Sequence, residues 1–228
     1  MIPFSFFLII VAFLLGLWAQ SRVTSAFKQY SNIRTSSNLT GAEVARQILD
    51  MAQIHDVEVV QIDGMLGDHY DPTSKRLCLS TDVYNTPSVS AAGIAAHETG
   101  HAIQHAKAYA PLQLRMMVVP ATQIVSQFMP IVMMGGLFFH FIPWMLAVKL
   151  AALGYGVMML FQLITLPVEF DASRRAKIIL QNMHIIQPGE ETNGVNKVLN
   201  AAAWTYVAAF IAALGNFLYL LSLSQRRN

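Results

Sequence analysis

Long apolar stretches alternate with polar ones along this chain. Residues 2–19 are apolar and uncharged, and their length suits one transmembrane helix, which needs about 20 residues. A longer apolar region covers residues 116–168, and a break at 139–144 divides it into two spans that form a tight hairpin. Residues 201–223 form a last apolar stretch. The pattern therefore predicts an α-helical membrane protein with about four transmembrane helices.

The basic residues predict how these spans are oriented. No Lys or Arg precedes the first apolar stretch, whereas Arg22, Lys28 and Arg34 follow it. This arrangement favours an uncleaved anchor over a signal peptide, which would begin with positive charge. The positive-inside rule then places residue 20 onward in the cytosol, and the basic segment 169–200 returns there. The two arginines of the C-terminal tail run against this rule, so the side of the tail stays open.

The polar stretch 20–115 reads as the main water-facing domain, with mostly helical α+β structure. A helix start at 38–43 opens a segment of helical periodicity, and 57–63 reads as a short strand. Residues 68–80 predict a hairpin that turns at Asp71-Pro-Thr-Ser. Residues 85–90 contain Asn, Thr and Ser, which commonly cap helices, so they predict the start of a further helix.

Composition agrees with a membrane protein and excludes some partners. Only 12% of the residues are charged and 54% are hydrophobic, whereas a soluble domain carries about 25% charged residues. The net charge is +2 and no basic run occurs, so nucleic acid is not an expected partner. The single cysteine, Cys78, excludes an internal disulfide and a zinc site built from cysteines.

The strongest chemical signal is His97-Glu98-Thr-Gly-His101, an H-E-x-x-H motif in a helix-favouring stretch. Positions four apart share one face of a helix, so the two imidazoles can converge on a single metal ion. Glu98 can then take a proton from a metal-bound water, which is the arrangement of a zinc hydrolase. Gly100 is a poor helix residue and indicates close packing over the site.

A catalytic zinc usually takes a third protein ligand, and several residues are candidates. His105 lies about 12 Å along a straight helix from His97, so it better suits a solvated face or a cleft edge. Glu169 and Asp171 follow the third span directly, where the chain returns to the same membrane side. They are about 200° apart on a helix, so only one can face the metal, and Glu169 is preferred. His184 and His69 are remoter options.

The order of these motifs resembles the bacterial YugP-type neutral zinc metallopeptidases. The resemblance covers nearly the whole chain and rests on three segments besides the N-terminal anchor: Ala-Ala-His-Glu-Thr-Gly-His-Ala-Ile-Gln (95–104), Leu-Pro-Val-Glu-Phe-Asp-Ala-Ser-Arg-Arg-Ala (166–176) and Val-Leu-Asn-Ala-Ala-Ala (198–203). More distantly, the order is similar to the HtpX and CAAX-prenyl-protease group of membrane gluzincins. The resemblance implies a zincin-like domain with one zinc per chain, bound by His97, His101 and Glu169, and Glu98 as the catalytic base.

One position departs from the distant relatives. They place an Asp four residues after the ligand Glu, where it holds a ligand histidine, but here that position is Ser173. The nearest acid is Asp171. Either Asp171 holds the histidine in altered geometry, or the ligand assignment differs.

The predicted activity is that of a membrane-bound zinc endopeptidase acting on membrane-associated polypeptides, with its active site on the cytosolic side of a bacterial plasma membrane. Candidate donors for the oxyanion are His69, Tyr70, Tyr206 and His184, and the sequence does not rank them. The 76–80 strand either pairs with an extended peptide or belongs to a plain core hairpin.

Two other functions remain open at this point. One is a non-enzymatic, zinc-stabilised membrane adaptor, which would not need Glu98. The other is an intramembrane site-2-type protease, but residues 89–106 are too polar for a lipid-facing span.

Overall fold

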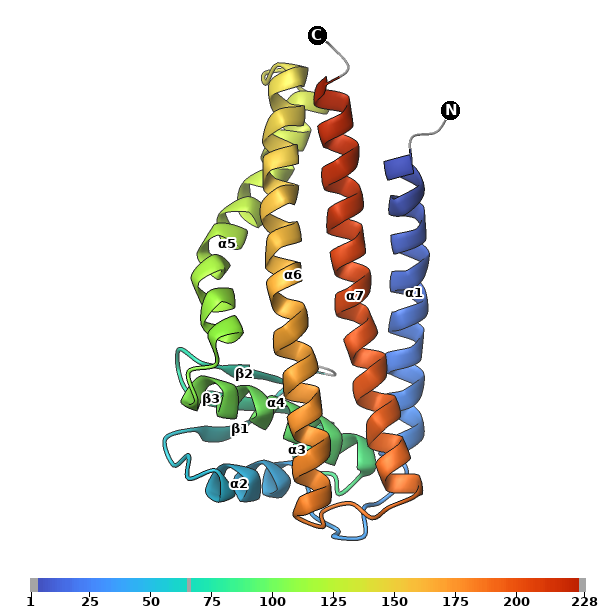
Figure 1. The fold of residues 1–228 in the computed structure, drawn as a ribbon, viewed down its shortest axis with the longest axis vertical. Coiled ribbons are helices and arrows are strands. Elements are labelled where there is room, and N and C mark those ends of the chain that lie inside the picture. The colour runs from blue at the N-terminus through green and yellow to red at the C-terminus, as the bar shows by residue number, and fades with distance from the viewer. Residues whose placement is uncertain (1–3, 65–66, 226–228) are drawn as a thin grey trace. The chain divides into compact units, whose positions relative to one another are not determined.

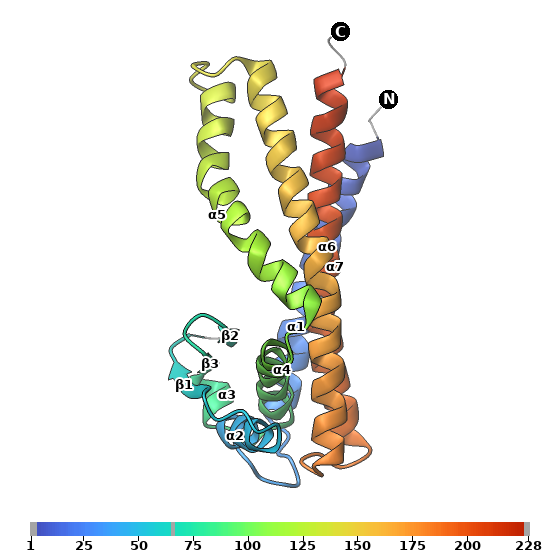
Figure 2. The same ribbon diagram turned by 60° about the vertical axis from the view of Figure 1, so that its left-hand side comes forward.

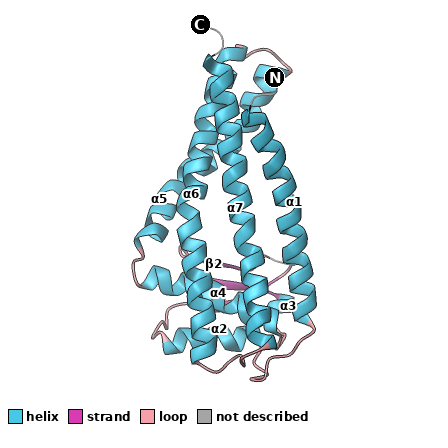
Figure 3. Cartoon of the chain, turned by 45° about the vertical axis from the view of Figure 1, so that its right-hand side comes forward, coloured by secondary structure: helices cyan, strands magenta, loops and turns pink. Residues whose placement is uncertain are grey.

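The structure is a computed structural model that describes residues 4–64 and 67–225. Its elements in chain order are α1 (Phe4–Ser31), α2 (Gly41–Met51), β1 (Glu58–Ile62), β2 (His69–Asp71), β3 (Arg76–Ser80), α3 (Thr81–Tyr84), α4 (Val89–Ala106), α5 (Ala110–Leu137), α6 (Trp144–Asn182) and α7 (Glu190–Gln225) (Figure 1). Helices dominate, and the described strands form one small sheet (Figure 3).

Four of these helices are long and apolar enough to cross a membrane: α1, α5, α6 and α7. This confirms the predicted number of spans, and the predicted break at 139–144 lies between α5 and α6. Helix α4, which carries the H-E-x-x-H motif, is not one of the four. In a helix every interior backbone group bonds within the segment, so such helices suit the lipid interior.

The chain divides into two compact units. The first comprises the described parts of 1–18, 113–166 and 205–228, which are stretches of the four apolar helices. Large apolar side chains such as Phe13, Phe128 and Leu153 are exposed on them, as expected for a lipid-facing surface. Helices α5 and α6 approach closely at Gly136, where an added Cβ would overlap the Ala147 methyl group. The predicted hairpin is therefore tightly packed.

The second unit comprises 19–112 and 167–204 and contains the sheet. Strand β2 pairs antiparallel with β3, which confirms the predicted hairpin. Strand β1 pairs in parallel with the other side of β3, so the strand order is β1-β3-β2. Both edges of β3 are therefore occupied, and the interpretation of 76–80 as a peptide-binding strand is wrong. The free edges belong to β1 and β2.

Local capping explains where two helices of this unit begin. Thr40 and Glu43 form a capping box at the start of α2, with Thr40 N–H donating to Glu43 Oε2 at 2.8 Å. Ser88 caps α4, because its hydroxyl accepts from Ala91 N–H at 3.2 Å. The sequence predicted both starts.

Helix α4 is the centre of the second unit. Nearly all of its side chains are buried, including Ala91, Ala92, Ala95 and Ala96. Alanine side chains lose no rotamer entropy on burial and let neighbouring elements approach. Figure 2 shows α4 between the sheet and the lower part of α6. The apolar core around it also includes Leu77 and Leu79 of β3 and residues of α2, α6 and α7.

Helix α6 does not stop where the sequence becomes polar. The apolar pattern indicates a span over 144–168, but the helix continues through Pro167 to Asn182. The segment around Glu169 is thus the direct continuation of an apolar helix. This continuity fixes the rotational position of Glu169 and of the residues after it.

Candidate metal centre

The two histidines of the H-E-x-x-H motif lie one turn apart on α4 and face the same way. Their ring centroids are 4.8 Å apart, and the rings are nearly perpendicular. His97 and His101 are 9% and 7% exposed. The i, i+4 spacing on an unbroken helix explains this convergence.

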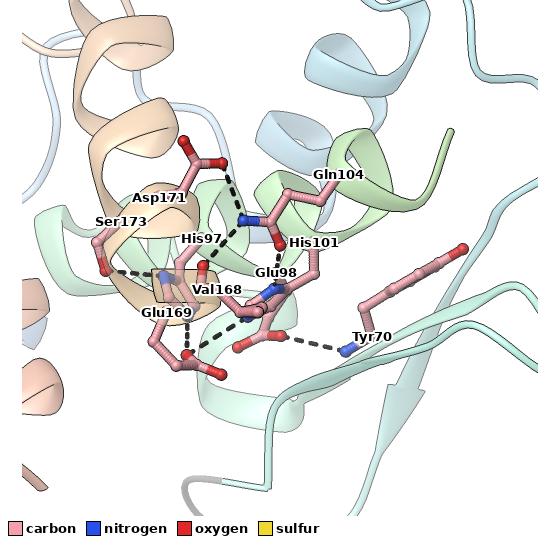
Figure 4. A network of polar contacts seen from close by, with 9 residues as sticks. All are labelled: Tyr70, His97, Glu98, His101, Gln104, Val168, Glu169, Asp171 and Ser173. Atoms are coloured by element: carbon pink, nitrogen blue, oxygen red, sulfur yellow. Dashed lines mark hydrogen bonds and ion pairs between the residues drawn. The ribbon is translucent and has the colours of Figure 1, made fainter. Parts of the chain in front are cut away.

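Glu169 of α6 completes the cluster. Its Oε2 lies 3.2 Å from His97 Nε2 and 3.5 Å from His101 Nε2, and the residue is 2% exposed (Figure 4). The ligand atoms of the three side chains all lie within 4.8 Å of one another, so they could hold one metal ion. Within the described part of the chain, this is the one such group of three. Two imidazole nitrogens and a carboxylate oxygen are ligands that zinc accepts.

Asp171, the alternative third ligand, points elsewhere. Its Oδ2 accepts a hydrogen bond from Gln104 Nε2 at 3.0 Å, and both of its oxygens contact arginines, Arg174 and Arg175. Glu169 and Asp171 are about 200° apart around the continuous helix α6, so Asp171 points away from the histidines when Glu169 faces them.

Glu98 lies beside the cluster, and its Oε2 accepts a hydrogen bond from the backbone N–H of Tyr70 in β2 at 3.1 Å. Burial raises the pKa of Glu98 above the ordinary glutamate value. The two histidines oppose this shift, whereas the charges of Glu169 and Asp68 add to it. A carboxylate with a raised pKa accepts a proton more readily near neutral pH.

The outer nitrogen of each histidine also has a partner. Ser173 Oγ lies 3.1 Å from His97 Nδ1, and Gln104 Oε1 lies 3.0 Å from His101 Nδ1. Both Nε2 atoms therefore face Glu169. The sequence indicated Ser173 as a candidate but gave no role to Gln104. Gln104 is three residues after His101, a spacing that places both on the same side of the helix.

The remaining candidates of the second unit contribute no ligand atom to the cluster. His69 is exposed and its Nδ1 lies 2.8 Å from Gly67 O. The Tyr70 hydroxyl lies 2.9 Å from His105 Nδ1, and burial together with Asp56 and Asp71 raises the pKa of Tyr70 to about 12. His184 lies two residues beyond the end of α6, where the chain turns with a φ of 56°. Tyr206 lies on α7 in the first unit.

Four apolar helices and a buried His-His-Glu group define a membrane protein with a candidate metal centre. The chain belongs to the family described as "Putative neutral zinc metallopeptidase", whose model matches residues 5–225. It is 46% identical over 213 residues to the "Putative membrane protease YugP" of Bacillus subtilis (strain 168), covering 91% of each chain. No solved structure matches. The family confirms the resemblance seen in the sequence.

Proposed function

We propose that this protein is a membrane-bound zinc metalloendopeptidase. The observation that carries the proposal is the convergence of His97, His101 and Glu169 within 4.8 Å, with the Glu98 carboxylate beside them. His97, His101 and Glu169 hold the ion, one per chain. Zinc in such a site polarises the scissile carbonyl and lowers the pKa of a water molecule.

The protein's own groups supply the proton transfers. Glu98 accepts the proton of the attacking water and delivers it to the leaving amine. The Tyr70 N–H orients the Glu98 carboxylate through its hydrogen bond at 3.1 Å.

Strand β2 is the element best placed to align a peptide. It is an edge strand of the sheet, and its Tyr70 N–H is directed to Glu98 rather than to β3. An extended peptide beside this edge would pass the Glu98 carboxylate. Its backbone would bond to groups of β2 other than the Tyr70 N–H, which already donates to Glu98, and such bonds do not select a sequence.

The substrates we propose are membrane-associated polypeptides on the cytosolic side of a bacterial plasma membrane. Support comes from the connectivity of the chain, because α6 carries Glu169 directly after its apolar stretch. An intramembrane site-2-type protease is less well supported, since α4 is not one of the four apolar helices.

The test compares purified wild type with Glu98→Gln. We expect one zinc per chain by mass spectrometry in both proteins, and a loss of about 10²–10⁴-fold in cleavage of a peptide library by the variant. Glu58→Gln is a matched control, because Glu58 is an exposed carboxylate that pairs with Arg76. If wild type binds zinc but cleaves no peptide, and Glu98→Gln binds zinc as wild type does, the results favour the adaptor function instead.

A further inference from the structure

Gln104 is a fully buried polar residue on α4, one turn beyond His101, with 0% exposure. Its Nε2 donates to Val168 O at 2.8 Å and to Asp171 Oδ2 at 3.0 Å (Figure 4). Both partners are acceptors only, so they fix which end of the side-chain amide points towards α6. The carbonyl oxygen of the amide is left for His101.

This orientation determines which nitrogen of His101 carries a proton. Gln104 Oε1 lies 3.0 Å from His101 Nδ1, and a carbonyl oxygen can only accept a hydrogen bond. This hydrogen bond therefore requires the hydrogen on His101 Nδ1, which is the tautomer that leaves Nε2 free to bind a metal ion. In the neutral imidazole, the lone pair is then on Nε2, the atom that lies 3.5 Å from Glu169 Oε2.

Asp171 is in turn held by two arginines. Its carboxylate is 7% exposed and contacts Arg174 and Arg175. The Arg175 side chain is 25% exposed, whereas that of Arg174 is 68% exposed, so solvent screens the Arg174 pair more strongly. These contacts fix the position of the Asp171 carboxylate, whose Oδ2 accepts the hydrogen bond from Gln104.

We propose that Gln104 is a positioning residue for His101, and that Asp171 acts on the metal centre through Gln104. The proposal deepens the proposed function and rests on it for the identity of the metal. The proposal also explains how the site manages with Ser173 at the position where the distant relatives have an Asp. In this chain a different group holds each histidine. Ser173 holds His97, and the Asp171–Gln104 pair holds His101.

The first test measures zinc affinity by chelator competition in Gln104→Met, which keeps a similar length and removes all hydrogen bonds. We expect about 10–100-fold weaker binding, the usual cost of losing a partner behind a metal ligand. Thr99→Val is the matched control, because Thr99 is equally buried on α4 and its hydroxyl bonds only the Ala95 carbonyl in its own helix. We expect wild-type zinc affinity in that variant.

A double variant separates positioning from packing. Gln104→Glu keeps an acceptor for His101 but sets two carboxylates side by side, so zinc affinity falls. Adding Asp171→Asn supplies an amide donor to the new carboxylate, and we expect the double variant to bind zinc more tightly than Gln104→Glu alone. A further loss on adding Asp171→Asn would overturn the proposal.

The last test does not depend on zinc. Nitrogen-15 NMR of the metal-free Glu169→Ala protein, labelled at histidine and held at alkaline pH, reports which ring nitrogen is protonated once the carboxylate that lies 3.5 Å from His101 Nε2 is removed. In this background we expect a protonated His101 Nδ1 when Gln104 is present, with or without Thr99→Val, and a shift of the proton to Nε2 when Gln104→Met is added. If wild type binds no zinc, the proposed function fails while this measurement still decides the role of Gln104. An unchanged tautomer in Gln104→Met contradicts the inference.

Discussion

At the scale of single residues, Glu169 and Asp171 are two positions apart and make different contacts. Glu169 reaches both histidines, whereas Asp171 reaches Gln104 and two arginines. We expect Glu169→Ala to lose stoichiometric zinc, because one of three ligands is removed. Asp171→Ala should still bind one zinc, about 10–100-fold more weakly, since it acts behind a ligand. Metal analysis and chelator competition on both variants measure this.

Glu190→Ala serves as the control for loss of an acidic residue, because Glu190 is exposed at the start of α7. It should bind zinc as wild type does. Wild-type affinity in Glu169→Ala together with zinc loss in Asp171→Ala would reverse the ligand assignment.

Helix geometry alone predicted that Glu169 and Asp171 point in different directions. The preference for Glu169 came from the residues that follow it, because the geometry does not say which of the two faces the histidines. The sequence could not find the role of Gln104, whose partners Val168 and Asp171 lie on α6, more than sixty residues along the chain. A glutamine near a metal motif becomes informative only once its tertiary partners are known. The role of Ser173 likewise depends on a tertiary contact, because its hydroxyl on α6 contacts His97 on α4.

At the scale of elements, the metal centre depends on how closely α4 and α6 approach. A Cβ added at Gly100 would lie 3.0 Å from Ala172 O and 3.3 Å from Ala172 Cα, both backbone atoms of α6. Gly100→Ala gains about 1 kcal/mol of helix propensity but must separate the helices by a few tenths of an ångström. We expect little change in metal-free stability and about tenfold weaker zinc binding, because Glu169 moves with α6. Thermal unfolding with and without zinc measures both effects.

Gly93→Ala is the matched control on the same helix. There the added Cβ would meet the Val195 side chain at 3.6 Å, which is ordinary contact. This variant should gain stability and keep wild-type zinc affinity. Equal zinc affinity in both glycine variants would show that the α4–α6 spacing does not limit metal binding.

Elements with local signals were predictable. The capping residues Thr40 and Ser88 marked the starts of α2 and α4, and the turn at 71–74 marked the β2–β3 hairpin. The parallel pairing of β1 with β3 was not predictable, because register between distant strands has no local signature. The continuation of α6 to Asn182 was also missed, since a change from apolar to polar residues marks a change of surroundings and not a helix end.

At the scale of the whole molecule, the orientation in the membrane is open to a direct test. The basic residues Arg22, Lys28 and Arg34 after the first apolar stretch predict that the second unit is cytosolic. In a Cys78→Ser background, Gln29→Cys should resist an impermeant thiol reagent in intact cells, and Phe141→Cys, exposed between α5 and α6, should react. Both should react after the membrane is opened. The reverse pattern in intact cells would invert the proposed topology.

The connectivity of the chain also predicts which substrates are cut. Helix α5 begins four residues after α4 ends, and Glu169 lies on α6 directly after its apolar stretch. Both segments that carry the proposed ligands are therefore tethered within a few residues of apolar helices. Polypeptides in or on the membrane should then meet the site more often than free ones, because tethering raises their local concentration.

The measurement uses one cleavable sequence in two forms, attached to a transmembrane helix or free in solution, with the protein in detergent-free vesicles. We expect faster turnover of the attached form at equal total concentration, and no turnover of either form by Glu98→Gln. Dissolving the vesicles in excess detergent should remove most of the difference, since both forms then encounter the enzyme by free diffusion. Equal turnover in intact vesicles would mean that the apolar helices only anchor a general peptidase.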